Sequence, residues 1–138
     1  MQTDVAAQTF LALKRIAVVG VSRAGTSPAN AIAKRLRETD HDVFAVNPAA
    51  QEIDGEVCYP NLAAIDGGVE GVVVVTAPEV ATDIAAQVRQ AGAEWIWFHQ
   101  GFGPASFDDE TLQVAREAGL HVISVGCPMM YCEPDKFH

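Results

Sequence analysis

The sequence has little positive charge, no long apolar run and few cysteines. Nine Lys and Arg residues stand against eighteen Asp and Glu, so the 138-residue chain carries a net charge of −9. This balance excludes broad, non-specific nucleic-acid binding, which needs a basic face. Apolar runs such as 71–75 are far too short to cross a bilayer, and the first residues lack the basic start and apolar stretch of a signal peptide. We therefore expect a cytoplasmic protein with no membrane partner.

The cysteines and the overall composition indicate an ordinary reduced globular domain. Cys58, Cys127 and Cys132 form no dense disulfide framework, and their odd number is typical of free thiols in a cytosolic protein. The spacing from Cys127 to Cys132 fits no standard zinc pattern, so we expect no metal site. With 49% hydrophobic and 20% charged residues, the chain can bury a core, and its length predicts one domain over residues 1–138.

The charge is unevenly distributed along the chain. Residues 1–41 hold six basic and three acidic residues, a local charge of +3, and the remainder carries −12. An acidic protein can therefore still present a positive field to an anion. For Lys34, Arg35 and Arg37 the competing interpretation is a solvated helix face.

Short β-branched runs alternate with helical stretches from one end of the chain to the other. Both faces of these runs are apolar, which is typical of a parallel sheet covered on both sides, and right-handed crossovers then give a three-layer, doubly wound α/β fold of Rossmann type. The predicted strands are 16–21, 43–46, 57–59 at an edge, 72–75, 95–98 and 122–125. The predicted helices are 5–13, 28–39, a single turn at 62–65, one from 78 to Gly92, and one from Ser106 to Gly119.

Three details of these elements are specific predictions. Ser27 has the character of an N-cap, with Pro28 at the first helical position. On the helix after residue 78, Val80, Ile84 and Val88 form one apolar stripe, with Ala81 and Ala85 beside it. Ser106 is expected to cap the last helix, with acids in its first turn, where the helix dipole favours them.

Small, polar, glycine and proline residues gather where the predicted strands end. In open parallel sheets, ligands bind outside the carboxyl ends of the strands, at the point where strand order reverses. The predicted ligand-binding residues are Gly20, Val21, Ser22, Arg23, Ala24, Gly25, Ser27, Asn47, Pro48, Thr76, Ala77, Pro78, His99 and Gln100, with Gly101, Gly126 and Cys127 beside them. The other ends of the strands show no such concentration, and this asymmetry predicts a small-molecule site.

The loop after the first strand is the strongest single signal. Gly20 and Gly25 allow close approach of the backbone, and the following helix offers unpaired N–H groups to an anion. Ser22 and Ser27 add hydroxyl groups, and Arg23 adds a cation suited to phosphate. The competing interpretation is that both glycines only shape a tight turn.

The usual dinucleotide fingerprint is missing. The first loop has a Gly-x-x-x-x-Gly pattern in place of G-x-G-x-x-G, and the second strand ends in Asn47 where an NAD site normally has an acid. There is no Walker motif. NADP remains open if Arg23 contacts a 2′-phosphate.

Several segments together resemble the small single-domain CoA-binding proteins, which are similar to the CoA-binding domain of the succinyl-CoA synthetase α subunit. They are IAVVGVSRAGTSPANAIAKRL, FAVNP, VCYPNLAAI, GVVVVTAPE, the tryptophan strand ending in HQG, and GCPMMY. The resemblance spans about residues 10–132. It implies a coenzyme A site, with the phosphates at residues 22–25 and further contacts at 47–48, 76–78 and 99–101. Relatives often carry a phosphate-binding Lys after Pro48, where this chain has Ala49 and Ala50. The resemblance therefore implies that Arg23 or the first helix supplies that charge, or that the affinity for CoA is weaker.

The chemistry-bearing residues leave the choice between binding module and enzyme to be tested. His99 could titrate near neutral pH but is more often a ligand or backbone contact, and Cys127 could exchange disulfides with a CoA thiol. We expect a non-catalytic protein that binds CoA or an acyl-CoA. The alternatives are a nucleotide-sensing regulatory subunit, or a small NADP-dependent or acyl-CoA enzyme that uses His99 or Cys127. Trp95 and Trp97 face one side of a strand and pack under a helix or bury a homodimer patch.

Overall fold

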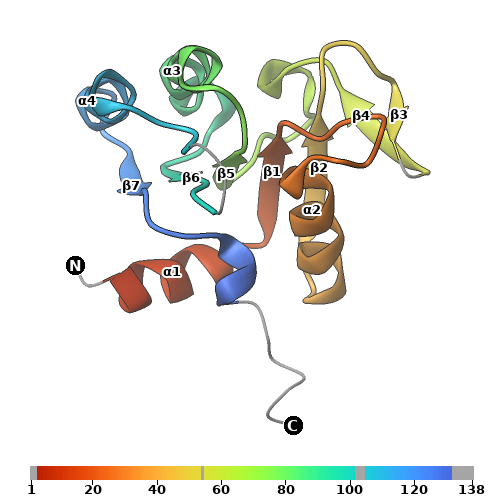
Figure 1. Cartoon of the computed structure of the whole chain (residues 1–138), viewed down its shortest axis with the longest axis horizontal. Helices are drawn as coiled ribbons and strands as arrows, with labels where there is room; N and C mark the ends of the chain where they lie inside the picture. The colour runs from red at the N-terminus through yellow and green to blue at the C-terminus, as the bar shows by residue number, and fades with distance from the viewer. Residues whose placement is uncertain (1–2, 54, 102–104, 132–138) are drawn as a thin grey trace, which may run out of the picture.

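The computed structural model describes residues 3–53, 55–101 and 105–131, which form one seven-stranded sheet with helices on both faces (Figure 1). The strands are β1 (Arg15–Val19), β2 (Asp42–Val46), β3 (Glu52–Ile53), β4 (Glu56–Tyr59), β5 (Gly71–Val74), β6 (Trp95–Phe98) and β7 (His121–Ile123). The helices are α1 (Thr3–Leu11), α2 (Pro28–Glu38), α3 (Pro78–Gln87) and α4 (Asp109–Glu117), with short 3-10 turns η1 (Leu62–Ala64), η2 (Arg89–Ala91) and η3 (Pro128–Met130). None of the helices in this described part is long and apolar enough to cross a membrane.

The strand order is β3-β4-β2-β1-β5-β6-β7, and every neighbouring pair is parallel except β3 with β4. After β1, the chain adds β2, β3 and β4 on one side of it, and then returns to add β5, β6 and β7 on the other side. Strand order reverses between β1 and β5, so the crevice at their carboxyl ends is where such a sheet binds ligands. The predicted three-layer, doubly wound Rossmann-type fold is confirmed.

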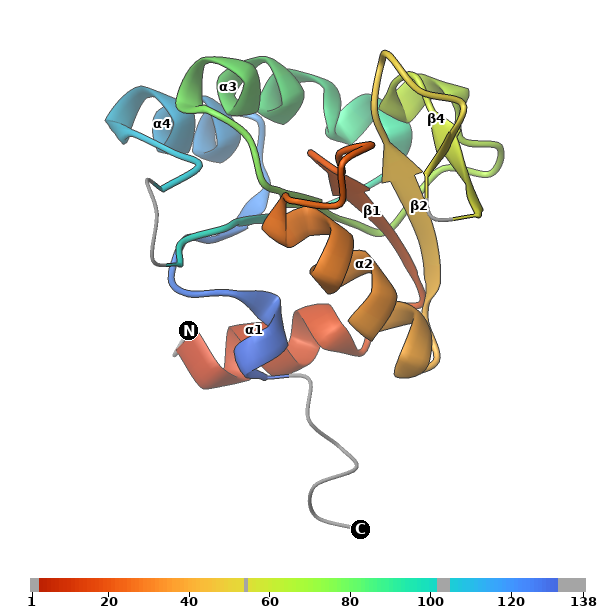
Figure 2. The same cartoon turned by 45° about the vertical axis from the view of Figure 1, so that its right-hand side comes forward.

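Alternate residues of the central strands pack into two separate hydrophobic cores, one on each face of the sheet. Ala17 and Val19 face α3 and α4, whereas Ile16 and Val18 face α1 and α2. Figures 1 and 2 show these helix pairs on opposite faces of the sheet. Because both faces are buried, the central strands are apolar throughout, which is why their hydrophobic runs are continuous.

The two tryptophans of β6 lie on the α1 side, as their alternation predicts. Trp97 is fully buried, and the Phe10 ring of α1 meets it edge-on with 5.4 Å between ring centroids. Trp95 packs against the same core and lies 4.6 Å from the ring of His121. Helix α1 thus covers Trp97 inside this chain.

Two sequence predictions about these elements are wrong. Strand β4 is not an edge strand, because the two-residue β3 pairs outside it in a hairpin too short to show a sequence pattern. On α3, Val80 is 47% exposed, whereas Ala81 and Ala85 are fully buried, as is Val88 directly after the helix. Cys132 lies outside the described residues.

The second correction concerns α4. Its N-cap is Asp108, which accepts a hydrogen bond from the Thr111 backbone at 2.9 Å while the Thr111 hydroxyl accepts one from the Asp108 backbone. This reciprocal capping box needs a side chain at the third helical position, and Thr111 supplies it. Ser106 lies two residues earlier and has a different partner.

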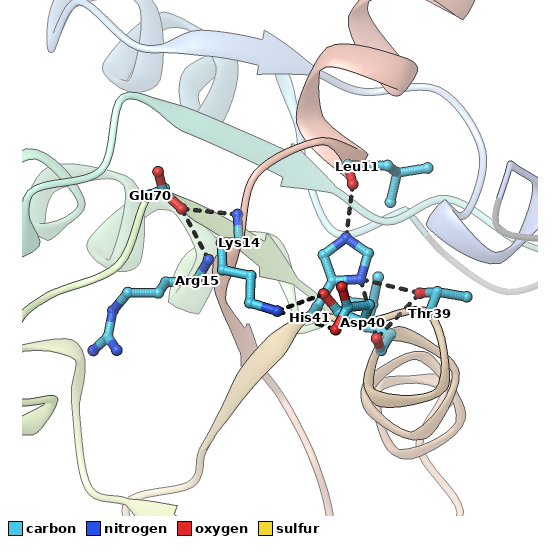
Figure 3. Close-up of polar contacts among 8 residues, drawn as sticks. Leu11, Lys14, Arg15, Thr39, Asp40, His41 and Glu70 are labelled. Atoms are coloured by element: carbon cyan, nitrogen blue, oxygen red, sulfur yellow. Dashed lines mark hydrogen bonds and ion pairs between the residues drawn. The ribbon is translucent and has the colours of Figure 1, made fainter.

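Polar side chains form hydrogen bonds with the backbone at the amino-terminal edge of the sheet, opposite the predicted site (Figure 3). The Glu70 carboxylate accepts backbone hydrogen bonds from Lys14 and Arg15 at 2.8 and 2.9 Å. His41 Nε2 lies 2.7 Å from the carbonyl oxygen of Leu11. His41 Nδ1 lies 3.0 Å from the Leu36 carbonyl, so one imidazole joins the ends of α1 and α2.

We expect Glu70→Gln to lower the free energy of unfolding at neutral pH and to lose that effect in acid. The backbone amides of Arg15 and then Lys14 stabilise the carboxylate and hold the pKa of Glu70 below its ordinary value. A depressed carboxyl pKa stabilises the fold above the unfolded-state value of about 4.3 and stops doing so as the pH falls through the folded-state pKa. Urea unfolding of both proteins between neutral and acidic pH measures the difference.

The control is Glu117→Gln on α4, where an exposed carboxylate accepts only a long 3.4 Å hydrogen bond from Gln113. We expect only a small difference in the free energy of unfolding from wild type. A Glu70→Gln effect that stayed constant down to strong acid would contradict the role assigned to the two amides.

Candidate functional site

The carboxyl end of β1 touches the carboxyl end of β5 at Gly20. Gly20 has a φ of +114°, and a Cβ placed on it would lie 2.0 Å from the carbonyl oxygen of Val75. On its other side, the Gly20 amide donates to the carbonyl of Val46 at 3.4 Å. No residue with a side chain fits this position, so the crevice between β1 and β5 has a floor of bare backbone.

The loop that follows is held in shape by Asn30 of α2. Its side-chain oxygen accepts a hydrogen bond from the Ser22 amide and its nitrogen donates to the Ser22 carbonyl, each at 2.9 Å. The Gly25 amide closes the turn on the same carbonyl at 3.2 Å. Ser27 caps α2 as predicted, its hydroxyl accepting from the Ala29 amide at 3.1 Å. The Ser22 hydroxyl similarly accepts from the Thr26 amide at 3.3 Å, so both hydroxyls have structural partners in this loop.

Asn47 joins the end of β2 to the first loop. Its side-chain nitrogen donates to the Val21 carbonyl at 2.9 Å, and its oxygen accepts from the Ala49 amide at 2.7 Å. The same side chain therefore fixes the turn through Pro48 and the path of the chain after β1. This gives Asn47 a structural role at the position where an NAD site normally has an acid.

Arg23 reaches from the first loop to the turn after β2. Its guanidinium donates to the backbone carbonyl of Ala49, and the residue is otherwise exposed. Within the described part of the chain it has no acidic partner. An unneutralised guanidinium thus lies over the carboxyl edge of the sheet, beside Ala49.

Ser106 has a role that the sequence did not suggest. It is only 3% exposed, and its hydroxyl accepts a hydrogen bond from the Thr76 amide at 3.2 Å. Its own amide donates to the His99 carbonyl at 3.0 Å. Ser106 therefore connects the ends of β5 and β6 and positions Thr76, Ala77 and the start of α3.

A cleft of about 340 Å³ opens at the crevice between β1 and β5. Apolar side chains of Val46, Val80 and Ile84 form part of its wall, and Asp83 of α3 contributes a carboxylate. The cleft is lined by Val19, Gly20, Val21, Val46, Asn47, Pro48, Pro60, Asn61, Thr76, Val80, Asp83, Ile84 and Gln87. Its volume is within the range of small-molecule sites.

The cleft brings together some of the predicted site residues and leaves others outside. Gly20, Val21, Asn47, Pro48 and Thr76 line it. The rest lie along the same edge without lining the cleft: Ser22, Arg23, Ala24, Gly25, Ser27, Ala77, Pro78, His99 and Gln100. Gly25 instead borders a second hollow along the outer side of α2, with Lys34 and Arg37.

Several lining residues were missed because they lie away from the strand ends. Pro60 and Asn61 follow β4, and Val80, Asp83, Ile84 and Gln87 lie on α3. One available signal was the apolar spacing on α3, which is wider than a single stripe. Val80 and Ala81 are neighbours on a helix and point in different directions, so they cannot both face the core. One of the two therefore faces the cleft or solvent.

His99 and Cys127 lie at the far half of the edge. The Gln100 amide donates to the Gly126 carbonyl at 3.0 Å, so the ends of β6 and β7 remain side by side. Burial lowers the pKa of His99, which favours the neutral imidazole. Burial also raises the pKa of Cys127, with a smaller opposing effect from the Met129 amide, so this sulfur is held as a thiol. The described residues contain no group of acids, histidines and cysteines suited to a metal ion.

A family model described as a CoA binding domain matches residues 14–133. The chain belongs to this family. The match covers the whole sheet and both helix layers except α1, and it agrees with the resemblance carried by the sequence motifs.

The relatives include small proteins of similar length and larger ligases. An uncharacterised protein of Bacillus subtilis is 29% identical over 83% of this chain and 82% of its own. An acetate–CoA ligase (ADP-forming) of Archaeoglobus fulgidus is 30% identical over 83% of this chain, which spans only 18% of the ligase. Among solved structures, a hypothetical protein of Pyrococcus horikoshii has 31% identity and a TM-score of 0.85, covering 94% of this chain and 89% of that one.

We expect Gly20→Ala to lower the free energy of unfolding by about 3 kcal/mol or more. The substitution combines a strained positive φ with a methyl group driven into the Val75 carbonyl, and neither backbone can move without breaking the β1–β5 register. Chemical denaturation followed by tryptophan fluorescence measures the loss.

Gly25→Ala is the matched control. Gly25 also has a positive φ, +70°, but a Cβ there would meet nothing within 4 Å. Its cost is the backbone conformation alone, about 1–2 kcal/mol. Equal losses in the two variants would show that close approach to β5 is not what requires glycine at position 20.

Proposed function

We propose that this protein binds coenzyme A along the carboxyl edge of its sheet and performs no chemistry on it. The observation that carries the proposal is the cleft at the crevice between β1 and β5, next to an arginine that has no acidic partner among the described residues. Membership of the CoA-binding family supports the identity of the ligand. The activity of the larger acetate–CoA ligases is not part of the proposal, because this chain corresponds to less than a fifth of their length.

The charges around the cleft favour one orientation of the cofactor. Asp83 on the α3 wall repels phosphate, whereas Val46, Val80 and Ile84 offer apolar surface to an adenine ring. Arg23 and the amino-terminal end of α2 lie on the opposite side of the first loop, where the helix dipole favours an anion. The adenosine part then occupies the cleft, and the phosphates lie over residues 22–25.

Arg23 replaces the missing lysine in this proposal. Related proteins often have a phosphate-binding lysine after the proline of the second strand, and this chain has Ala49 there. The Arg23 guanidinium bonds the Ala49 carbonyl, which brings a cation from the first loop to that same turn. An arginine also offers two parallel donors to a phosphate, which an ammonium group does not.

The states of His99 and Cys127 support binding without turnover. An activated cysteine needs a lowered pKa or an adjacent base, and burial instead raises the pKa of Cys127. Within the described residues, no carboxylate hydrogen-bonds the His99 ring to orient it as a general base. The homodimer and the regulatory partner considered from the sequence remain predictions.

We expect Arg23→Ala to weaken CoA binding by about tenfold, the usual effect of removing one charge-assisted contact to phosphate. Calorimetry against CoA, NAD and NADP measures the affinities, and the wild-type affinity for CoA should fall as salt is added. Arg116→Ala on α4 is the matched control, since it removes the same charge from a helix that does not line the cleft.

Tight NADP binding with CoA inert would overturn the proposal and mean that Arg23 contacts a 2′-phosphate. Equal losses in Arg23→Ala and Arg116→Ala would instead show that net charge, and not the first loop, attracts the cofactor.

A further inference from the structure

His99 is a buried polar side chain at the end of β6 with a fixed backbone. Its amide donates to the Val74 carbonyl and its carbonyl accepts from the Ser106 amide, both at 3.0 Å. The residue is only 8% exposed. Side chains alternate along β6, so its imidazole lies on the same face as Trp97.

The His99 ring has no hydrogen-bond partner within the described part of the chain. Among the described residues no fully buried side-chain nitrogen or oxygen lacks a partner, so the unpaired His99 ring reaches the surface, where a ligand can bond it. Burial lowers the pKa of His99, and the neutral ring offers one donor and one acceptor.

Gly101 leaves one edge of this ring uncovered. A Cβ at Gly101 would lie 3.0 Å from Cε1 and 3.3 Å from Nε2 of His99, so a side chain there would press against that edge. Because Gly101 has no side chain, Nε2 of His99 stays accessible from the carboxyl edge of the sheet.

We propose that His99 hydrogen-bonds the sulfur-bearing end of the bound cofactor, as a free thiol or a thioester. This inference rests on the proposed function and extends it. From β1 to β6 the distance is two strand spacings, or roughly 10 Å. A cofactor with its phosphates at the first loop and its flexible arm along the edge passes β5 and arrives at His99.

The test compares CoA with adenosine 3′,5′-bisphosphate, which keeps the adenosine part and lacks the arm. Calorimetry should show that His99→Leu weakens CoA binding by roughly fivefold to tenfold, the usual effect of one hydrogen bond. Affinity for the bisphosphate should stay within about twofold. His99→Gln, which keeps a polar group, should recover part of the loss. Acetyl-CoA is titrated alongside, and a loss confined to it would identify the thioester carbonyl as the bound group.

His121→Leu is the matched control, because His121 is exposed at the opposite end of the sheet and stacks on Trp95. It should leave both affinities unchanged. Equal weakening of CoA and the bisphosphate by His99→Leu, or no weakening of CoA, acetyl-CoA and the bisphosphate alike, would overturn this inference while CoA binding itself stood. If the wild type bound neither compound, the proposed function would fail instead. Should His99→Leu not fold, the wild-type His99 ring resonances decide: they should shift with CoA and not with the bisphosphate.

Discussion

The carboxyl edge of this sheet depends on how closely β1 approaches β5 at a single residue. Gly20 holds the first loop between the Val46 carbonyl on one side and the Val75 carbonyl on the other. With any side chain there, the loop would be pushed away from β5 and the crevice would be filled. The position where strand order reverses is therefore open because Gly20 has no side chain to fill it. The backbone of Gly20 forms the bottom of the cleft.

The loops around this contact hold one another before any ligand arrives. Asn30 fixes both backbone groups of Ser22, and Asn47 fixes Val21 and Ala49. Ser106 then ties the end of β5 to the end of β6. A site whose loops are already ordered loses little conformational entropy on binding, so more of the contact energy appears as affinity. Arg23 is the residue of this loop that can meet a phosphate with a full positive charge.

The fold was predictable from the sequence because the strands are buried on both faces and the helices have clear ends. Ser27 and Pro28 fix the start of α2, and Trp95–Phe98 matches β6 residue for residue. The edge hairpin was not predictable, since β3 has two residues and exists only by pairing with β4. Ser106 misled for a different reason: serine before acids is typical of a helix cap, but Asp108 has a partner in Thr111 at the correct position and Ser106 does not.

The candidate site shows the same division between local and long-range information. The strand-end residues were found because a parallel sheet always gathers them at one edge. Asn30 was missed because an asparagine inside a helix carries no local signal for a bond eight residues back, and Val80 because its exposure depends on where α3 lies over the crevice. Such residues are set by packing between elements, which no window of sequence contains.

The electrostatic arrangement explains how an acidic chain can suit an anionic cofactor. A net charge of −9 repels phosphate at long range, but that repulsion is screened beyond about 8 Å at physiological salt. Within that distance, a phosphate over the first loop is affected mainly by Arg23 and the amino-terminal end of α2. Asp83 lies on the other wall of the cleft and repels a phosphate that entered in the reverse orientation. In the proposed binding mode, Asp83 therefore contributes to the direction in which the cofactor lies, with its arm toward β5 and β6.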